Sequence, residues 1–244
     1  MRGLVWAELL GLRRSRAALV LMGVTAFFVA LSTFGNAATE QHKITLGQVT
    51  PADASYFLVG VASVSFLFAA IGGALRVTGE LRSRSMGLTV LACPDRTPVL
   101  VAKSLVAAAL GGAYGLVAVA TAAGIGFVEL GPQFVLSSRI VGLGALVVAA
   151  GALAGPWGVM IGTLLRSSLL AGGALFIYTA MAEAAVIHYF PVVGRWLPGG
   201  ALASLLTDPS VQHRLAPVAG LAVLVGWLAV AAAAAVPAFR RQEL

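Results

Sequence analysis

Six long apolar runs constrain the fold of this chain more than any other feature. Each run is long enough to cross a hydrocarbon core about 30 Å thick as a helix that rises about 1.5 Å per residue. Hydrophobic residues make up 59% of the 244 residues and charged residues only 10%, an excess that a single aqueous core cannot bury. The runs lie at residues 17–35, 55–76, 98–128, 139–165, 167–189 and 216–238.

These runs predict an all-α polytopic membrane protein with six transmembrane helices, in which residues 1–244 form one transmembrane domain. The apolar content excludes a soluble enzyme, a disordered chain and a fibrous repeat. Spanning strands are excluded because the runs show no period of two. The single cysteine, Cys93, excludes a disulfide framework. A signal peptide is a competing interpretation of the charged start and the run at 17–35, but this run is long for a signal and no clear cleavage motif follows it.

The positive charges between the runs predict the orientation of the chain. Twelve of the 16 Lys and Arg residues fall before the first run, in the connection after the second run or at its two edges (Arg76 and Lys103), after the fourth run or in the tail. Because Lys and Arg accumulate on the cytoplasmic side of membrane proteins, we expect both termini to lie in the cytoplasm, and we expect the protein in the cell membrane. The cations on the other side are Lys43, Arg139, Arg195 and Arg214.

No motif for ATP binding, metal binding or nucleophilic catalysis occurs in the sequence. The two lysines, Lys43 and Lys103, lack the glycines that precede the lysine of a phosphate-binding loop. The three histidines are scattered, so they do not have the spacing of metal ligands. We therefore predict that the chain is not an enzyme and that it holds no catalytic residue, metal or cofactor of its own.

Residues 3–16 have the pattern of an amphipathic helix that lies at the membrane surface. Trp6, Leu9 and Leu10 recur at helical spacing and can face lipid, while Glu8 and Arg13 can face water. The segment ends at Arg16, directly before the first run. We expect an interfacial helix that leads into the first span.

The connection between the second and third runs is the most informative segment. Charged residues precede an apolar stripe, and Pro94 then ends the short helix that we expect there. A helix with a charged start and an apolar back suits docking in a groove of another protein, although a solvated loop explains the composition equally well. The candidate contact residues are Glu80, Arg82, Arg84, Ser85, Leu88, Leu91, Pro94, Asp95 and Arg96.

This connection resembles the loop between spans two and three of ABC-2 type permeases, the membrane subunits of ABC exporters. The resemblance rests on Glu80-x-Arg82, then Leu91-x-x-Pro94-Asp95-Arg96, then Ala102-Lys103, and on the charged segment from Glu8 to Arg16. Six spans and a short helix before the last span also fit the layout of that family. Two positions depart from the pattern, since Arg84 stands where the family usually has Gly and Ser85 where it has Thr.

The resemblance implies a division of labour between chains. In the family, two membrane subunits pair with two cytosolic P-loop ATPases, which bind ATP and Mg. The segment from Glu80 to Arg96 would be the coupling helix, and its charges would set docking specificity. The resemblance further implies an exporter for a hydrophobic or amphipathic substrate, such as a drug, a peptide or a lipid, with a second permease subunit that we expect to be identical.

One acidic residue, Glu183, lies well inside a predicted span. Such groups are costly in a membrane and are functional candidates by default. Glu183 could line a translocation path together with His188, or it could be a hydrogen-bonded strut to Tyr178 or His188. Beyond this span, residues 200–207 are apolar enough for a short interfacial helix.

Small residues recur at helix-packing spacing. Three G-x-x-x-G motifs, at Gly111, Gly151 and Gly158, predict close helix contacts, although chance matches are expected in a chain this rich in glycine.

Two other functions compete with the exporter. A transporter driven by an ion gradient would need intramembrane ionisable residues, and only Glu183 fits. A non-transporting membrane protein, such as an immunity factor, would need no coupling segment.

Overall fold

The computed structural model describes residues 2–13, 15–83, 96–206 and 213–241 of the chain. The structure is 89% helical, and its described part contains no strand. Six helical segments are long and apolar enough to cross a membrane, in agreement with the six predicted spans. These spans are Arg16–Thr45, Pro51–Arg82, Thr97–Gln133, Ser138–Leu165, Ser168–Tyr189 and Pro217–Arg240.

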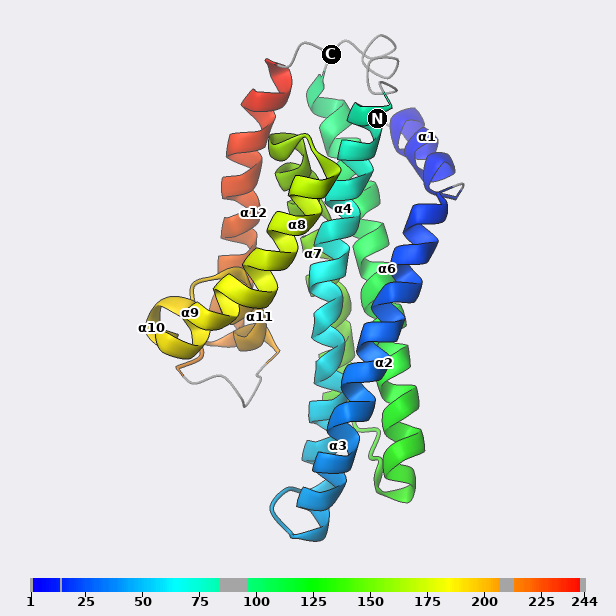
Figure 1. Cartoon of the computed structure of the whole chain (residues 1–244), viewed down its shortest axis with the longest axis vertical. Coiled ribbons are helices and arrows are strands. Elements are labelled where there is room, and N and C mark those ends of the chain that lie inside the picture. The colour runs from blue at the N-terminus through cyan, green and yellow to red at the C-terminus, as the bar shows by residue number, and fades with distance from the viewer. Residues whose placement is uncertain (1, 14, 84–95, 207–212, 242–244) are drawn as a thin grey trace.

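The spans are built from labelled helices that follow one another along the chain (Figure 1). The N-terminal helix α1 precedes the first span, α2, and two short helices, α10 and α11, lie between the fifth and sixth spans. The bounds are α1 Arg2–Arg13, α2 Arg16–Thr45, α3 Pro51–Gly60, the 3₁₀ turn η1 Val61–Val64, α4 Ser65–Arg82, α6 Arg96–Leu130, the 3₁₀ turn η2 Gly131–Gln133, α7 Ser138–Leu165, α8 Ser168–Ile177, the π-helical turn η3 Tyr178–Ala182, α9 Glu183–Tyr189, α10 Pro191–Gly194, α11 Pro198–Leu205 and α12 Pro217–Arg240.

The first span is longer than its apolar run predicts. Hydropathy places its end at residue 35, but α2 continues to Thr45. Residues 36–45 contain no Gly or Pro that would break the helix, and Lys43 pairs with Glu40 one turn earlier, at 2.6 Å. The helix stops where Gly47 adopts a left-handed φ of +67°, the usual residue at such a position. The polar residues after position 35 therefore end the apolar run, but they do not end the helix.

Helices α4, α6 and α7 form the densely packed centre of the molecule, and glycines allow their backbones to touch. A Cβ atom added to Gly158 of α7 would lie 1.8 Å from the carbonyl oxygen of Ala70 in α4. One added to Gly155 would lie 2.1 Å from the oxygen of Ala107 in α6, and one added to Gly111 would lie 2.1 Å from the oxygen of Gly151. The expected close contacts at the three glycine motifs are thus confirmed.

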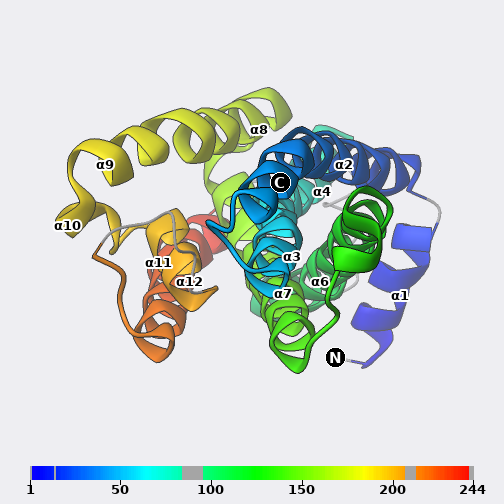
Figure 2. The same cartoon turned by 90° about the horizontal axis from the view of Figure 1, so that it is seen from below.

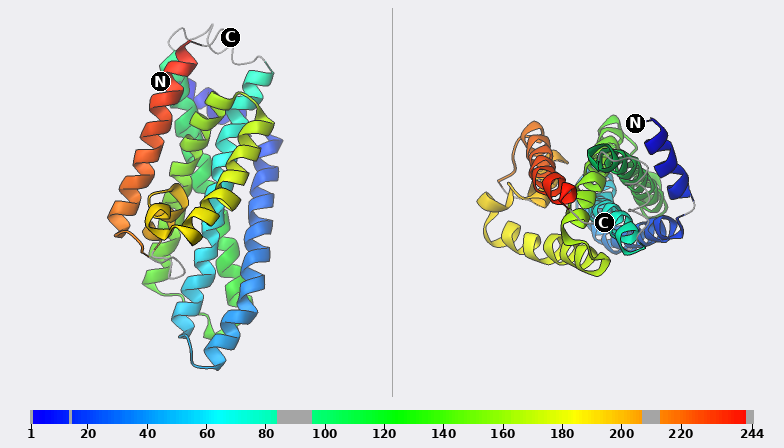
Figure 3. Two further views of the ribbon diagram at one scale, coloured as in Figure 1. Left: turned by 60° about the vertical axis from the view of Figure 1, so that its left-hand side comes forward. Right: turned by 90° about the horizontal axis from the view of Figure 1, so that it is seen from above.

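The other spans lie around this centre and are much less buried. In the most apolar 18-residue window of each span, 61% of the second and 56% of the fourth are buried, against 17% of the first, 17% of the fifth and 22% of the sixth. Viewed from below, α8 and α9 run away from the centre, and α11 and α12 stand on the same flank (Figure 2). Two further views show the same separation (Figure 3).

The two ends of the molecule differ. The chain start, α1 and the end of α12 share one end, and the turn between α2 and α3 lies at the opposite end (Figure 1). The candidate site described next lies at the first of these ends, which we call the terminal end.

Candidate functional site

Helix α1 packs against α6 through an inward-facing glutamate. The carboxylate of Glu8 forms ion pairs with Nη2 of Arg76 at 2.5 Å and with Nζ of Lys103 at 2.6 Å. The expectation that Glu8 faces water is therefore wrong. The physical reason is that two cations of α4 and α6 lie beneath α1, and periodicity along α1 alone cannot reveal them.

The apolar face of α1 agrees with its prediction. The side chains of Trp6, Leu9 and Leu10 are 66%, 37% and 49% exposed, which leaves an apolar face for lipid. Arg16 is exposed at the start of α2, while the side chain of Arg13 lies outside the described residues.

Lys103 connects the two ends of the segment that resembles a coupling loop. Its side chain is fully buried, and Nζ contacts a carboxylate oxygen of Glu80 as well as that of Glu8. Glu80 is 25% exposed, so it points partly into the protein and is not free to dock elsewhere. The last turn of α4 and the second turn of α6 are thereby held together.

The structure describes only some of the remaining residues predicted for docking. Arg82 is exposed at the end of α4. Arg96 begins α6, but its side chain lies outside the described residues. The docking prediction also falls on six residues that lie outside the described part of the chain: Arg84, Ser85, Leu88, Leu91, Pro94 and Asp95.

Charge balance explains how this cluster tolerates burial. Two carboxylates, Glu8 and Glu80, meet two cations, Arg76 and Lys103, so the group is formally neutral. Arg76 also donates to the backbone oxygen of Glu8 at 2.6 Å. Burial opposes ionisation of Glu8, but hydrogen bonds to Lys103 and Arg76 and their charges outweigh it, and they hold the pKa of this carboxyl below its ordinary value of 4.5. We call these four residues the ion cluster.

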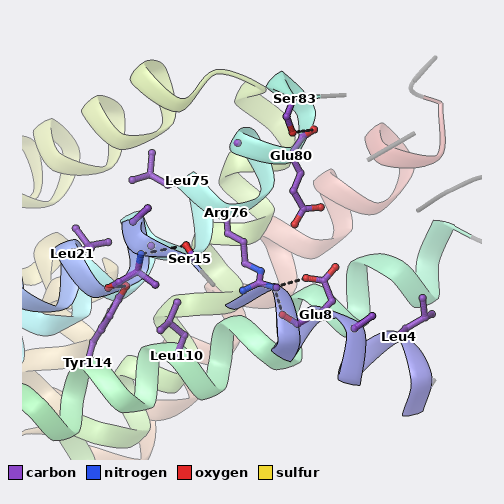
Figure 4. A pocket seen from close by; sticks show the side chains of 16 residues that line it. Leu4, Glu8, Ser15, Leu21, Leu75, Arg76, Glu80, Ser83, Leu110 and Tyr114 are labelled. Carbon is purple, nitrogen blue, oxygen red and sulfur yellow. Dashed lines mark hydrogen bonds and ion pairs between the residues drawn. The ribbon is translucent and has the colours of Figure 1, made fainter. Parts of the chain in front are cut away.

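A cavity of about 560 Å³ adjoins the ion cluster. It lies between α1, the start of α2, α4 and α6, and Figure 4 shows the side chains that line it. The charged groups of Glu8, Arg76 and Glu80 lie toward one end, and Leu21, Leu75, Leu110 and the ring of Tyr114 lie toward the other (Figure 4). Sequence reasoning missed this cavity, because its lining comes from four separated segments.

The carboxylate of Glu183 lies on the opposite flank of the molecule, at the start of α9. It is 2% exposed and accepts a hydrogen bond of 2.5 Å from the backbone N–H of Gly199, in the first turn of α11. A Cβ atom at position 199 would lie 3.0 Å from Cδ of Glu183, so any other residue there would press against the carboxylate. A π-helical turn, η3, directly precedes Glu183.

These contacts make Glu183 a strut to α11. In the described residues it forms no hydrogen bond with Tyr178 or His188, the two partners expected for a strut. His188 is exposed and packs edge-on against Tyr189, with ring centroids 4.9 Å apart. The short helix expected at residues 200–207 is present as α11, Pro198–Leu205. Sequence reasoning missed α11 as the partner, and the Pro-Gly-Gly at residues 198–200 is the one pattern that points to it.

The spacing of charges in the sequence was a signal for part of the ion cluster. Arg76 and Glu80 are four residues apart and share one face of α4, a spacing that favours interaction. The partners on α1 and α6 have no such signature.

Among the described residues, no three His, Cys, Asp or Glu side chains gather as a metal site would require.

Comparison with models of known protein families finds no match to this chain, and comparison with curated proteins finds none either.

Proposed function

We propose that this chain is the permease subunit of an ATP-driven exporter of the ABC-2 type. It works as a dimer of six-span subunits with two cytosolic P-loop ATPase subunits, and it moves a hydrophobic or amphipathic substrate, such as a drug, a peptide or a lipid, out of the cell. Both termini face the cytoplasm of the cell membrane. ATP and Mg belong to the ATPase, and the chain contributes no catalytic residue.

The observation that carries the proposal is the contact between Glu80 and Lys103. These residues flank residues 84–95 and belong to the sequence pattern that resembles the coupling loop. Their contact holds the start and the end of that segment at a constant spacing. A segment anchored in this way transmits a push from a docked protein to two spans at once.

The packing of the spans supports a path for that push. Helices α4 and α6 both contact α7 through backbone at glycines, so the three move as one body. The glycines of the fifth and sixth spans make no such backbone contact with α4, α6 or α7, and these two spans are mostly exposed. Displacement of the dense centre relative to these flanking spans would open and close a route across the membrane.

The exposed apolar faces support a dimer. Large side chains such as Phe27 and Phe34 of α2 and Leu169 and Phe176 of α8 are 48–85% exposed in the single chain. Lipid or a second subunit can cover such faces, and a second permease subunit would cover part of them.

The mass of the intact complex tests the proposal. The tagged chain is co-expressed with its neighbouring genes, purified in mild detergent and weighed by native mass spectrometry. We expect two copies of this chain with two copies of a P-loop ATPase. A stable complex without an ATPase would overturn the proposal and favour a gradient-driven transporter or a protein that does not transport.

A pair of charge reversals tests the docking surface. Arg82→Glu lies next to the proposed contact and is exposed, so it should reduce ATPase co-purification by about tenfold or more without unfolding the permease. Arg241→Glu is the matched control, since Arg241 is exposed beyond α12 at the same terminal end. Equal losses in both variants would contradict a specific contact at Arg82. Glu80→Ala is a poorer test, because it also breaks the ion cluster.

A further inference from the structure

We propose that the cavity beside the ion cluster is a binding site for one zwitterionic phospholipid with a primary ammonium headgroup. This site does not depend on an ATPase partner. It lies beside an amphipathic helix, α1, whose exposed Trp6 and leucines place it at the membrane surface.

The cavity has the shape of an amphipathic ligand. Along α4 its lining runs from Ser83 back to Gly72, a distance of about 16 Å at about 1.5 Å per residue. Ser83, Glu80 and Arg76 lie toward one end, and Leu75, Leu21 and Leu110 lie toward the other (Figure 4). A purely polar ligand would leave the leucines uncovered, and a purely apolar one would bury the charges without partners.

Arg76 supplies the recognition of a phosphate. Its Nη2 is occupied by Glu8, while the side chain as a whole stays 13% exposed where it lines the cavity. The exposed part of the guanidinium can donate a charge-assisted hydrogen bond to a phosphate oxygen in the cavity.

Glu80 supplies the recognition of an ammonium. One of its oxygens contacts Lys103, and the side chain is 25% exposed where it lines the cavity. The ion cluster is formally neutral, so it matches a ligand that carries one positive and one negative charge. An anionic lipid would add an unbalanced negative charge beside a cluster that is already neutral. A choline headgroup cannot donate an N–H to Glu80.

Gly79 offers a way to block the cavity without disturbing the cluster. It lines the cavity, and a Cβ atom built on it meets nothing within 4 Å. Gly79→Leu therefore fills space that the ligand needs. Gly23→Leu is the matched control, since Gly23 is an exposed helical glycine of α2 with the same open surroundings and does not line the cavity.

The test counts lipids retained by the full-length protein. The wild type and both variants are reconstituted in nanodiscs with equal parts of phosphatidylethanolamine, phosphatidylcholine and phosphatidylglycerol, all with the same acyl chains. They are then extracted in mild detergent and weighed by native mass spectrometry. We expect the wild type and Gly23→Leu to retain one phosphatidylethanolamine per chain, at least about tenfold above the other two lipids. Gly79→Leu, monodisperse and folded by thermal melting, should retain at least about tenfold less.

Three results would overturn the proposal. The first is equal retention by the wild type and Gly79→Leu. The second is equal or better retention of phosphatidylcholine or phosphatidylglycerol. The third is displacement of the lipid by soluble glycerophosphoethanolamine, which would show that the headgroup alone is recognised and that the apolar end has no role.

Discussion

The two sides of this molecule are held together by different forces. The side formed by α1, α4, α6 and α7 combines backbone contacts at glycines with a neutral cluster of one buried and three partly buried charges. The side formed by α9, α11 and α12 also has a backbone contact, since a Cβ atom on Gly220 of α12 would lie 2.7 Å from the carbonyl oxygen of Ala201 in α11, but its polar groups are joined by single hydrogen bonds. Glu183 accepts one from the N–H of Gly199, and Nε1 of Trp227 donates one to the backbone oxygen of Trp196 at 2.8 Å.

This difference sets how much each kind of contact costs to break. Backbone contacts between helices leave no side chain to adjust, so α4, α6 and α7 keep a constant spacing. Single hydrogen bonds can break and re-form elsewhere at a cost of about 1 kcal/mol each. Breaking one of these hydrogen bonds therefore costs less than separating the backbone contacts or the ion cluster of the dense side.

The largest expected effect comes from removing a cation of the ion cluster. Lys103→Met leaves Glu80 without its ion-pair partner and should cost about 3–5 kcal/mol of folding free energy. Arg139→Met is the matched control, because Arg139 and its partner Asp53 are 61% and 54% exposed, and should cost less than about 1 kcal/mol. Thermal melting in detergent measures both. Similar losses in the two variants would contradict a structural role for the ion cluster.

A smaller loss of folding stability is expected when a methyl group is added between two helices. Gly158→Ala places Cβ against the oxygen of Ala70 and should cost about 3 kcal/mol, because backbone must move. The same change at Gly142 of α7, which has open surroundings, should gain about 0.5–1 kcal/mol from helix propensity. The two melting temperatures should shift in opposite directions. Shifts of the same sign would show that the glycine contacts do not hold the dense side together.

The strut at Glu183 should be weaker still. Glu183→Ala removes the acceptor for the N–H of Gly199 and should cost about 1–3 kcal/mol. Glu183→Gln keeps a carbonyl acceptor and should melt within about 1 kcal/mol of the wild type. A cysteine at Ala203 of α11 should become more reactive to a soluble thiol reagent in the Ala variant only. If Glu183→Gln also stops export at every pH, the carboxylate has a role in translocation beyond that of a strut.

The smallest expected effect is a loss of folding stability at acidic pH. Because the pKa of Glu8 is lowered on folding, its contribution to stability is complete above pH 4.5 and is lost as the pH falls through the lower, folded-state pKa. Melting temperatures of the wild type and Glu8→Gln should differ at neutral pH and converge below pH 4.5. A difference between the two melting temperatures that grows as the pH falls would contradict a lowered pKa of Glu8.

Sequence reasoning predicted the spans well and their partners poorly. The six runs, the α1 segment and the helix at α11 all appear, because each depends on hydropathy or helical periodicity within one segment. The end of α2 was placed too early, since hydropathy marks where lipid contact ends and helix propensity continues the helix to Thr45. Glu8 was assigned to water because α1, taken alone, gives its glutamate no partner.

The sequence by itself determined that this chain is helical, apolar and long enough to cross a membrane six times, because burial of apolar residues and helix formation act over neighbouring residues. Only the tertiary structure decided which charges meet. Glu8 pairs with Arg76 across 68 positions and with Lys103 across 95, and Glu183 reaches Gly199 across 16. Such contacts depend on how whole helices pack, and a local pattern of residue types does not identify the partner helix.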